Sequence, residues 1–283
     1  MANARSPRRK RIPDLSFVSD AMPGIRREKD GEEFIYVWPN GRQVRDKTTL
    51  ARIRRLAVPP AYDKVWLCPR ADGHIQATGR DAKGRKQYRY HEQYRSSRDE
   101  DKYHRLIAFA KALPNIHSAV DRDLSRRGLP REKVLALAVH LLEKSLIRVG
   151  NETYAKSNRS FGLTTLRNRQ VRVEGSDVTF RFVGKSGVLH HLSLHDRKLA
   201  RLIRKLQDLP GQELFQYVDD EGHVRSVGSH DVNAYLREIS GGDFTAKDFR
   251  TWAGTALAIA AFSAGRPNAS QPMGCRTLKP RMR

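Results

Sequence analysis

Short segments with closely spaced apolar residues recur among polar stretches in the first hundred positions of the chain. They are rich in aromatic or β-branched residues and are separated by Gly, Pro and Asp. The four runs are Glu33–Trp38, Lys64–Cys68, His74–Thr78 and Lys86–Tyr90. This pattern predicts strands of a small antiparallel sheet. A helix is predicted between the first two strands, where Leu50, Ile53 and Leu56 repeat at helical spacing over residues 47–56.

A hydrophilic stretch at residues 95–102 breaks this pattern, and we place a domain boundary there. Pro130 marks the start of a helix whose apolar residues repeat at intervals of three and four up to Leu142. This helix is predicted to run into Arg148 and to stop at Gly150. Further helices are predicted at residues 196–206, 229–239 and 245–262.

Three segments in which apolar and polar residues alternate lie between these helices. They cover residues 171–173, 178–183 and 189–194. Turns at Gly175 and Gly187 separate them, which predicts a three-stranded meander. The expected fold class is therefore α+β. A small N-terminal antiparallel β domain at residues 13–97 precedes a larger, mainly helical domain with the meander at residues 98–262.

The charge of the chain is strongly one-sided. Its 283 residues include 54 Lys and Arg against 31 Asp and Glu, which leaves a net charge of +23. A charge of this size favours a polyanionic partner, of which nucleic acid is the commonest. A soluble protein that is merely basic is the alternative. The basic segment at residues 1–12 has a composition typical of a disordered arm.

Several other classes of protein find no support in the sequence. No apolar run is long enough for a membrane span and no signal peptide is visible, so we expect a cytoplasmic protein without a membrane partner. Cys68 and Cys275 form neither a disulfide framework nor a metal-binding spacing, and no metal or other cofactor is expected. Residues 184–186 resemble the end of a phosphate-binding loop. However, Thr179 replaces its first glycine, so no nucleotide is expected.

Three basic residues stand in apolar or turn-forming contexts. Arg148 follows an apolar helix, Lys185 follows a predicted strand, and Arg250 lies near the start of the last predicted helix. Cations in such positions suit a site that holds one phosphodiester while its negative charge rises. A lysine at a hairpin tip can also protonate a leaving oxygen. For Lys185 taken alone, a solvated turn lysine is the alternative.

The last predicted strand of the N-terminal domain carries candidate DNA contacts. Alternation places Lys86, Tyr88 and Tyr90 on one face and Gln87 and Arg89 on the other. Glutamine can read adenine in the major groove, and tyrosine can pack on bases or sugars. An aromatic pair that packs only on its own sheet is the alternative.

Together these residues resemble the type IB DNA topoisomerases of the poxvirus and bacterial kind, over roughly residues 17–262. The runs that carry the resemblance are Ile147-Arg148-Val149-Gly150, Phe182-Val183-Gly184-Lys185 and Lys247-Asp248-Phe249-Arg250-Thr251. The resemblance implies that Arg148 and Arg250 stabilise the transition state and that Lys185 protonates the departing 5′ oxygen. It also implies that the strand with Lys86, Gln87, Tyr88 and Tyr90 contacts a DNA groove and that Tyr154 contacts the DNA backbone.

In this family, a tyrosine attacks one strand of duplex DNA and forms a 3′-phosphotyrosyl bond. The duplex swivels, and the free 5′ hydroxyl then displaces the tyrosine. The resemblance thus implies a topoisomerase that relaxes supercoils without ATP, metal or cofactor, because the covalent link conserves the bond energy. It implies double-stranded DNA as the partner, held by a monomer whose two domains form a clamp.

The sequence departs from the family at the nucleophile. The family continues past the second arginine to a histidine and then to the attacking tyrosine. Here no histidine follows His230 and no tyrosine follows Tyr235. The segment at residues 263–283 is an aberrant basic tail without acidic residues. We therefore expect a truncated or frameshifted product that is inactive as written and exposes apolar surface on the helix at residues 245–262. A specialised inactive form is the alternative.

Two further functions are compatible with parts of this sequence. A DNA-binding module without chemistry would clamp duplex DNA with the same basic surface. A tyrosine recombinase would share the fold and much of the site, but it usually carries histidine three residues before the second arginine. Lys247 holds that position here, which favours the topoisomerase.

Overall fold

The structure is a computed structural model that describes residues 14–263. It divides into two compact units, unit 1 up to His104 and unit 2 from Arg105. The stretch at residues 95–102, which we predict as a boundary, lies inside helix α2 (Glu92–Leu124). Its Ser, Arg, Asp, Glu and Lys residues are compatible with an exposed helix, so hydrophilic composition does not end the helix there. The predicted arm and all but the first residue of the predicted tail lie outside the described residues.

Unit 1 contains a five-stranded antiparallel sheet with the order β2-β1-β3-β4-β5. Its strands are β1 (Ile25–Asp30), β2 (Glu33–Val37), β3 (Asp63–Leu67), β4 (Ile75–Arg80) and β5 (Lys86–Tyr90). Helix α1 (Lys47–Arg55) follows β2, and its N-cap residue Asp46 accepts hydrogen bonds from the backbone N–H groups of Thr48 and Thr49. The four predicted strands and the predicted helix are thus confirmed. A small core that includes Ile25, Ile53 and Leu67 lies beneath the sheet.

The sequence pattern does not predict strand β1. Five of its six residues are charged, and only Ile25 is buried. The strand nevertheless pairs with β2 on one side and with β3 on the other. Pairing on both sides satisfies the backbone whatever the side chains are, so strand formation here depends on tertiary context rather than on alternation.

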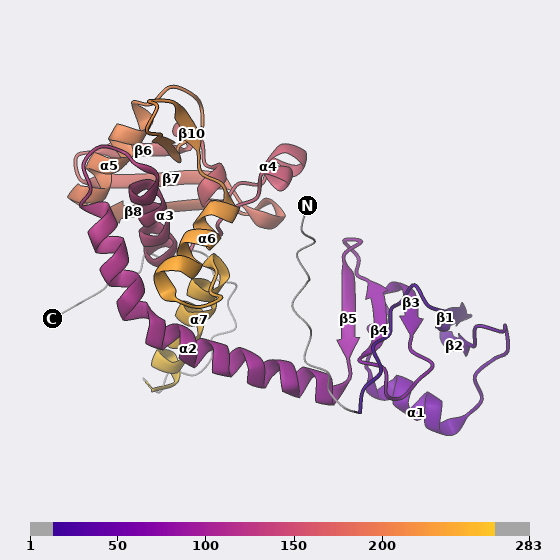
Figure 1. Cartoon of the computed structure of the whole chain (residues 1–283). Coiled ribbons are helices and arrows are strands. Elements are labelled where there is room, and N and C mark those ends of the chain that lie inside the picture. Colours follow the sequence, from indigo (N-terminus) through magenta and orange to yellow (C-terminus); the bar gives the residue numbers. More distant parts are fainter. Residues whose placement is uncertain (1–13, 264–283) are drawn as a thin grey trace. The chain divides into compact units, whose positions relative to one another are not determined.

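Unit 2 combines helices with two small antiparallel sheets (Figure 1). After α2 its helices are α3 (Arg131–Ser145), α4 (Glu152–Asn158), α5 (Arg197–Gln207), α6 (Ser229–Ser240) and α7 (Ala246–Ser263). Its strands are β6 (Val171–Glu174), β7 (Asp177–Val183), β8 (Leu189–His195), β9 (Gln216–Val218) and β10 (Val224–Ser226). The three-stranded sheet has the order β6-β7-β8, which confirms the meander. The α+β class is confirmed with it.

Helix α3 lies at the centre of unit 2 (Figure 1). It is apolar on nearly all sides, with Leu135, Ala136, Leu141 and Leu142 buried, as expected for a helix enclosed by other elements. It contacts α6, α7 and β9. Residues of α3 and Phe249, near the start of α7, therefore belong to one hydrophobic core.

The second half of α7 presents apolar side chains to solvent. Leu257, Ile259 and Phe262 are 42%, 61% and 72% exposed. Large contiguous apolar surface is uncommon on soluble monomers, and it promotes association with other molecules. The apolar surface that we predict on this helix is therefore present. Among the described residues, no helix combines the length and apolarity needed to cross a membrane.

Candidate active site

A cavity of about 910 Å³ in unit 2 collects residues from four separate segments. These segments are the loop after α3, helix α4 with the residues that follow it, the tip of the β7–β8 hairpin, and the start of α7. Its polar and charged lining residues are Arg148, Asn151, Tyr154, Asn158, Ser160, Lys185, Ser186, Lys247, Arg250 and Thr251. The structure thus brings together Arg148, Lys185, Arg250 and Tyr154, which are far apart in the sequence.

Arg148 lies in a loop rather than at the end of a helix. Helix α3 ends at Ser145 instead of Gly150, because Leu146 adopts a left-handed conformation with φ +54° and closes the helix. A leucine carries no sequence signal for that conformation, which is usually taken by glycine. The backbone carbonyl of Arg148 then accepts a hydrogen bond of 2.8 Å from the N–H of Leu163. The position of Arg148 therefore depends on a segment fifteen residues further along the chain.

Two glycines allow these segments to approach each other. A Cβ atom added to Gly162 would lie 2.5 Å from the Cα atom of Gly150 and 2.6 Å from the carbonyl oxygen of Arg148. Both neighbours are backbone atoms and cannot rotate away. Gly150 itself has φ +101°, a conformation that residues with a side chain rarely adopt. The two glycines thus determine where the Arg148 backbone runs.

We expect the substitution Gly162→Ala to lower the free energy of unfolding by about 1–3 kcal/mol, because the added methyl group must displace backbone. It should also weaken DNA binding, because the displaced backbone belongs to Arg148. Gly254→Ala is the matched control, since a Cβ atom there meets nothing within 4 Å. Thermal unfolding and duplex binding of both variants test this. An unchanged stability for Gly162→Ala would contradict it.

Lys185 lies at the tip of the β7–β8 hairpin. The N–H of Gly184 donates to the carbonyl of Val188 at 2.8 Å, which closes the tip. Ser186 and Gly187 have φ angles of +65° and +74° within this turn. The side chain of Lys185 is exposed and lines the cavity, so it is available to a bound anion.

Arg250 reaches the site from α7. Its guanidinium donates a hydrogen bond to the carbonyl of Leu146, at the end of α3. Burial lowers the pKa of Arg250, and the positive charge of Arg148 lowers it further. Two cations that repel each other in one cavity are stabilised when an anion binds between them. The electrostatics of this cavity therefore favour an anionic ligand.

The start of α7 is anchored by a bidentate ion pair. Arg105 of α2 contacts both carboxylate oxygens of Asp248, at 2.7 and 2.9 Å. Asp248 also accepts hydrogen bonds from the backbone N–H and the hydroxyl of Thr245, at 2.8 and 3.0 Å. The carboxylate of Asp248 thus caps the start of the helix that carries Arg250 by accepting both hydrogen bonds from Thr245.

The tyrosines of unit 2 differ in their access to the cavity. Tyr235, the last tyrosine in the sequence, is buried and donates its hydroxyl to Asp123 at 2.8 Å. Burial raises the pKa of Tyr235, and the hydrogen bond to Asp123 raises it further, so its phenolate is not readily formed. Tyr154 is 63% exposed and lines the cavity from α4. Among the described residues, Tyr154 is therefore the tyrosine that shares this cavity with Arg148, Lys185 and Arg250.

The candidate DNA contacts on β5 belong to unit 1. Lys86, Tyr88 and Tyr90 are exposed and alternate with the less exposed Gln87 and Arg89, which confirms the predicted faces. The rings of Tyr88 and Tyr90 are stacked, with centroids 5.7 Å apart. The side-chain amide of Gln87 donates a hydrogen bond of 3.0 Å to the carboxylate of Asp81, in the turn between β4 and β5. Gln87 thus has a structural partner, and its role in reading a base stays a prediction.

A group of three residues in the β9–β10 turn has the chemistry of a metal site. The ligand atoms of Asp219, Glu221 and His223 lie within 4.8 Å of one another. However, Asp219 already accepts hydrogen bonds from the side chain of Arg225 at 3.1 Å and from the N–H of His223 at 2.7 Å. These hydrogen bonds stabilise the β9–β10 turn, and they account for the closeness of the three side chains without a metal ion.

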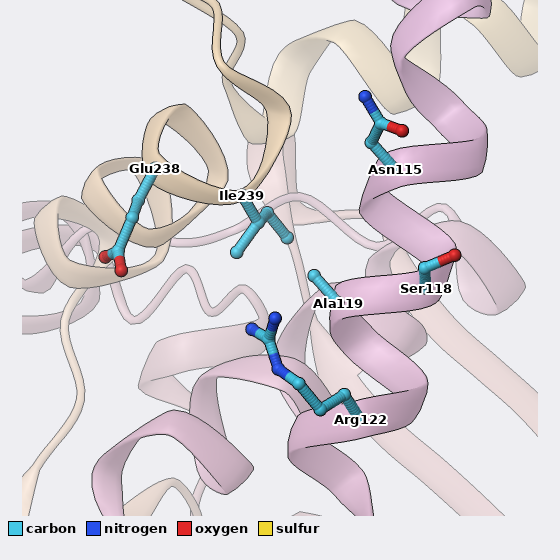
Figure 2. Close-up of a pocket in the computed structure, with 6 residues that line it drawn as sticks. All are labelled: Asn115, Ser118, Ala119, Arg122, Glu238 and Ile239. Atoms are coloured by element: carbon cyan, nitrogen blue, oxygen red, sulfur yellow. The ribbon is translucent and has the colours of Figure 1, made fainter.

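A second cavity, of about 520 Å³, lies between α2 and α6 (Figure 2). Arg122 of α2 and Glu238 of α6 stand on its facing walls. It contains none of the residues selected from the sequence. Sequence reasoning missed Asn151 and Asn158 among the residues that line the first cavity. The N-cap position of Asn151, before Glu152, was a usable signal for the start of α4.

Comparison with known proteins agrees with this arrangement. The family described as "Eukaryotic DNA topoisomerase I, catalytic core" matches residues 91–278, and "Bacterial DNA topoisomerase IB, N-terminal domain" matches residues 33–81. The chain is 36% identical over 235 residues to DNA topoisomerase 1B of Acanthamoeba polyphaga mimivirus, covering 82% of this chain and 70% of that protein.

More distant relatives show the same relationship. DNA topoisomerase I of monkeypox virus is 25% identical over 157 residues, which cover 55% of this chain and 49% of that protein. DNA topoisomerase 1 beta of Arabidopsis thaliana is 24% identical over 156 residues, covering 54% of this chain and 16% of that protein. The matched region thus spans about half the length of the monkeypox relative. The chain belongs to the type IB DNA topoisomerase family.

Proposed function

We propose that this chain binds duplex DNA and holds one phosphodiester between Arg148, Lys185 and Arg250 for type IB topoisomerase chemistry. One observation carries the proposal: Arg148 from a loop, Lys185 from a hairpin tip and Arg250 from a helix line one cavity of about 910 Å³, which Lys247 of the same helix also lines. The repulsion between Arg148 and Arg250 adds electrostatic support, because an anion between them relieves it. Unit 1 would contact the same duplex with the exposed face of β5, and the two units would clamp the DNA.

The proposed reaction is transesterification at the bound phosphodiester. Arg148 and Arg250 would donate hydrogen bonds to the nonbridging oxygens as their negative charge rises in the transition state. Lys185 would give a proton to the departing 5′ oxygen. The attacking group would be a tyrosine hydroxyl, and the energy of the broken bond would be conserved in the 3′-phosphotyrosyl link. No ATP or metal has a role in this scheme.

We further propose that the 283-residue polypeptide binds DNA without forming the covalent link. Tyr235 is engaged by Asp123 in the core, and no tyrosine follows it in the sequence. Tyr154 lines the cavity, but we assign it to the DNA backbone, as the family resemblance implies. For this polypeptide a DNA-binding module without chemistry is therefore the second candidate function, favoured by the burial of Tyr235.

Duplex binding at several salt concentrations tests the proposed site. The logarithm of the binding constant should fall linearly with the logarithm of salt concentration, with a slope of about −0.9 for each phosphate contacted. Arg148→Ala, Lys185→Ala and Arg250→Ala should each weaken binding. Each should also make the slope less steep, by at most about one phosphate contact, because the three side chains share one phosphodiester. Fluorescence anisotropy with a labelled duplex measures both quantities.

Arg172→Ala is the matched control, because Arg172 on β6 already forms an ion pair with Glu174 and its charge is partly neutralised. Its loss should change binding less than the loss of any of the three cavity residues. Binding that is insensitive to salt would refute a phosphate-contacting site. Equal effects for Arg172→Ala and Arg250→Ala would refute the assignment to the cavity.

A further inference from the structure

Beside the hairpin tip that carries Lys185 lies a histidine that the scheme above does not use. His190 is on β8, where it pairs across the hairpin with Phe182 of β7. The two rings are stacked, with centroids 4.9 Å apart and planes 11° apart. Phe182 is buried in the core of unit 2, so it provides a fixed surface for the imidazole.

The same imidazole also packs against the residue before Lys185. A Cβ atom added to Gly184 would lie 2.5 Å from Cδ2 and 2.6 Å from Nε2 of His190. The ring therefore covers the Cα atom of Gly184, directly beside the hairpin tip. Contact with Phe182 on one side and Gly184 on the other makes His190 a support for the segment that presents Lys185.

The charges around His190 are those of the cavity. Burial lowers the pKa of His190 below its usual 6.5, and the positive charges of Arg148, in the loop after α3, and Arg250, on α7, lower it further. The imidazole is therefore neutral near pH 7 while the cavity is empty. A phosphodiester bound by the same two arginines would offset their charge and favour the protonated ring.

We propose that His190 is a positioning residue of this site, which supports the Lys185 hairpin and gains a proton when a phosphodiester enters the cavity. This proposal rests on the proposed function and adds a residue and a pH dependence to it. Proton uptake on binding means that the bound state has the higher pKa. Binding is then strengthened below that pKa and loses this contribution as pH rises through it.

The test is duplex binding by the 283-residue chain from about pH 5 to about pH 8, the range in which histidine titrates. His190→Phe keeps an aromatic ring against Phe182 but cannot take up a proton. His191→Phe is the matched control, because His191 is the next residue on β8 and its side chain is exposed. One linked proton changes the dissociation constant by at most about tenfold per pH unit.

We expect the native chain and His191→Phe to bind the duplex more weakly as pH rises, by about three- to tenfold more than His190→Phe over the same range. Equal pH dependence in all three proteins would overturn the proposal while leaving DNA binding intact. Absence of duplex binding in all three would instead overturn the proposed function and this proposal with it.

The protonation of His190 can also be followed in the native chain, so that the result does not depend on whether a variant folds. NMR of the histidine ring signals follows the titration of His190 with and without the duplex, with His191 as the internal reference. The midpoint of His190 should move upward on addition of the duplex, and by more than that of His191. Equal movement of both signals, or none, would overturn the proposal.

Discussion

A chain completed with a family-like C-terminal segment should relax supercoiled plasmid, and Arg250→Ala should lower its relaxation rate by about 100- to 1,000-fold. This loss is typical when one preorganised donor to a developing oxyanion is removed. Arg250 should behave in this way because it lines the cavity with Arg148 and Lys185. The completing segment is joined after Ser263 and carries the histidine and the tyrosine that the resemblance calls for.

Lys185→Ala in the completed chain should give a loss of similar size, with a distinct signature. A DNA substrate whose 5′ oxygen is replaced by sulfur has a better leaving group and needs no protonation. It should therefore restore cleavage to Lys185→Ala but not to Arg250→Ala. Arg172→Ala again serves as the control and should relax plasmid at the unaltered rate. If the sulfur-substituted DNA restores cleavage to both variants or to neither, the assignment of Lys185 as the general acid is contradicted.

Asp248→Ala should lower the free energy of unfolding by about 1–3 kcal/mol, because it removes a helix cap and the buried partner of an ion pair whose arginine is partly exposed. Asp248 is 8% exposed and accepts bonds from Arg105 and Thr245. The lower end of the range applies if the side chain of Arg105, 41% exposed, turns to solvent. Glu174→Ala, which breaks the exposed pair with Arg172, should cost less than about 1 kcal/mol.

The contribution of Asp248 should also depend on pH. Burial alone would raise the pKa of Asp248, but the hydrogen bonds from Arg105 and Thr245 outweigh it and hold the pKa below its usual value. A carboxylate with a depressed pKa stabilises the fold above its unfolded-state pKa, and this contribution is lost as pH falls through the folded-state pKa. The stability difference between native and Asp248→Ala proteins should therefore shrink under acid conditions. Urea unfolding at neutral and acid pH measures it, and a constant difference would contradict the account.

The sequence predicts the fold class and the three cations because each of these depends on local pattern. Alternation marks β5 and the meander, and an apolar helix marks α3. Arg148, Lys185 and Arg250 can be singled out because each stands in an apolar or turn-forming run. Features with a local cause are therefore readable from the chain alone.

The remaining features depend on contacts between distant segments. Strand β1 forms because it pairs on both sides, although its own residues are mostly charged. Gly150 and Gly162 matter because two backbones meet there, and the partner of Asp248 lies 143 residues away on α2. His190 looks like an ordinary strand residue until its ring is seen against Phe182 and Gly184. Tertiary contact, rather than composition, gives these residues their structural roles.

Trapping of a covalent DNA adduct tests the central claim most directly. The 283-residue chain, its Tyr154→Phe variant and the completed chain are incubated with supercoiled plasmid and then denatured. We predict that all three bind the plasmid, but that only the completed chain forms a denaturant-stable adduct. An adduct with the 283-residue chain that disappears in Tyr154→Phe would make Tyr154 the nucleophile and contradict the account. Binding without an adduct by the completed chain would contradict the assignment of the cavity to phosphodiester cleavage.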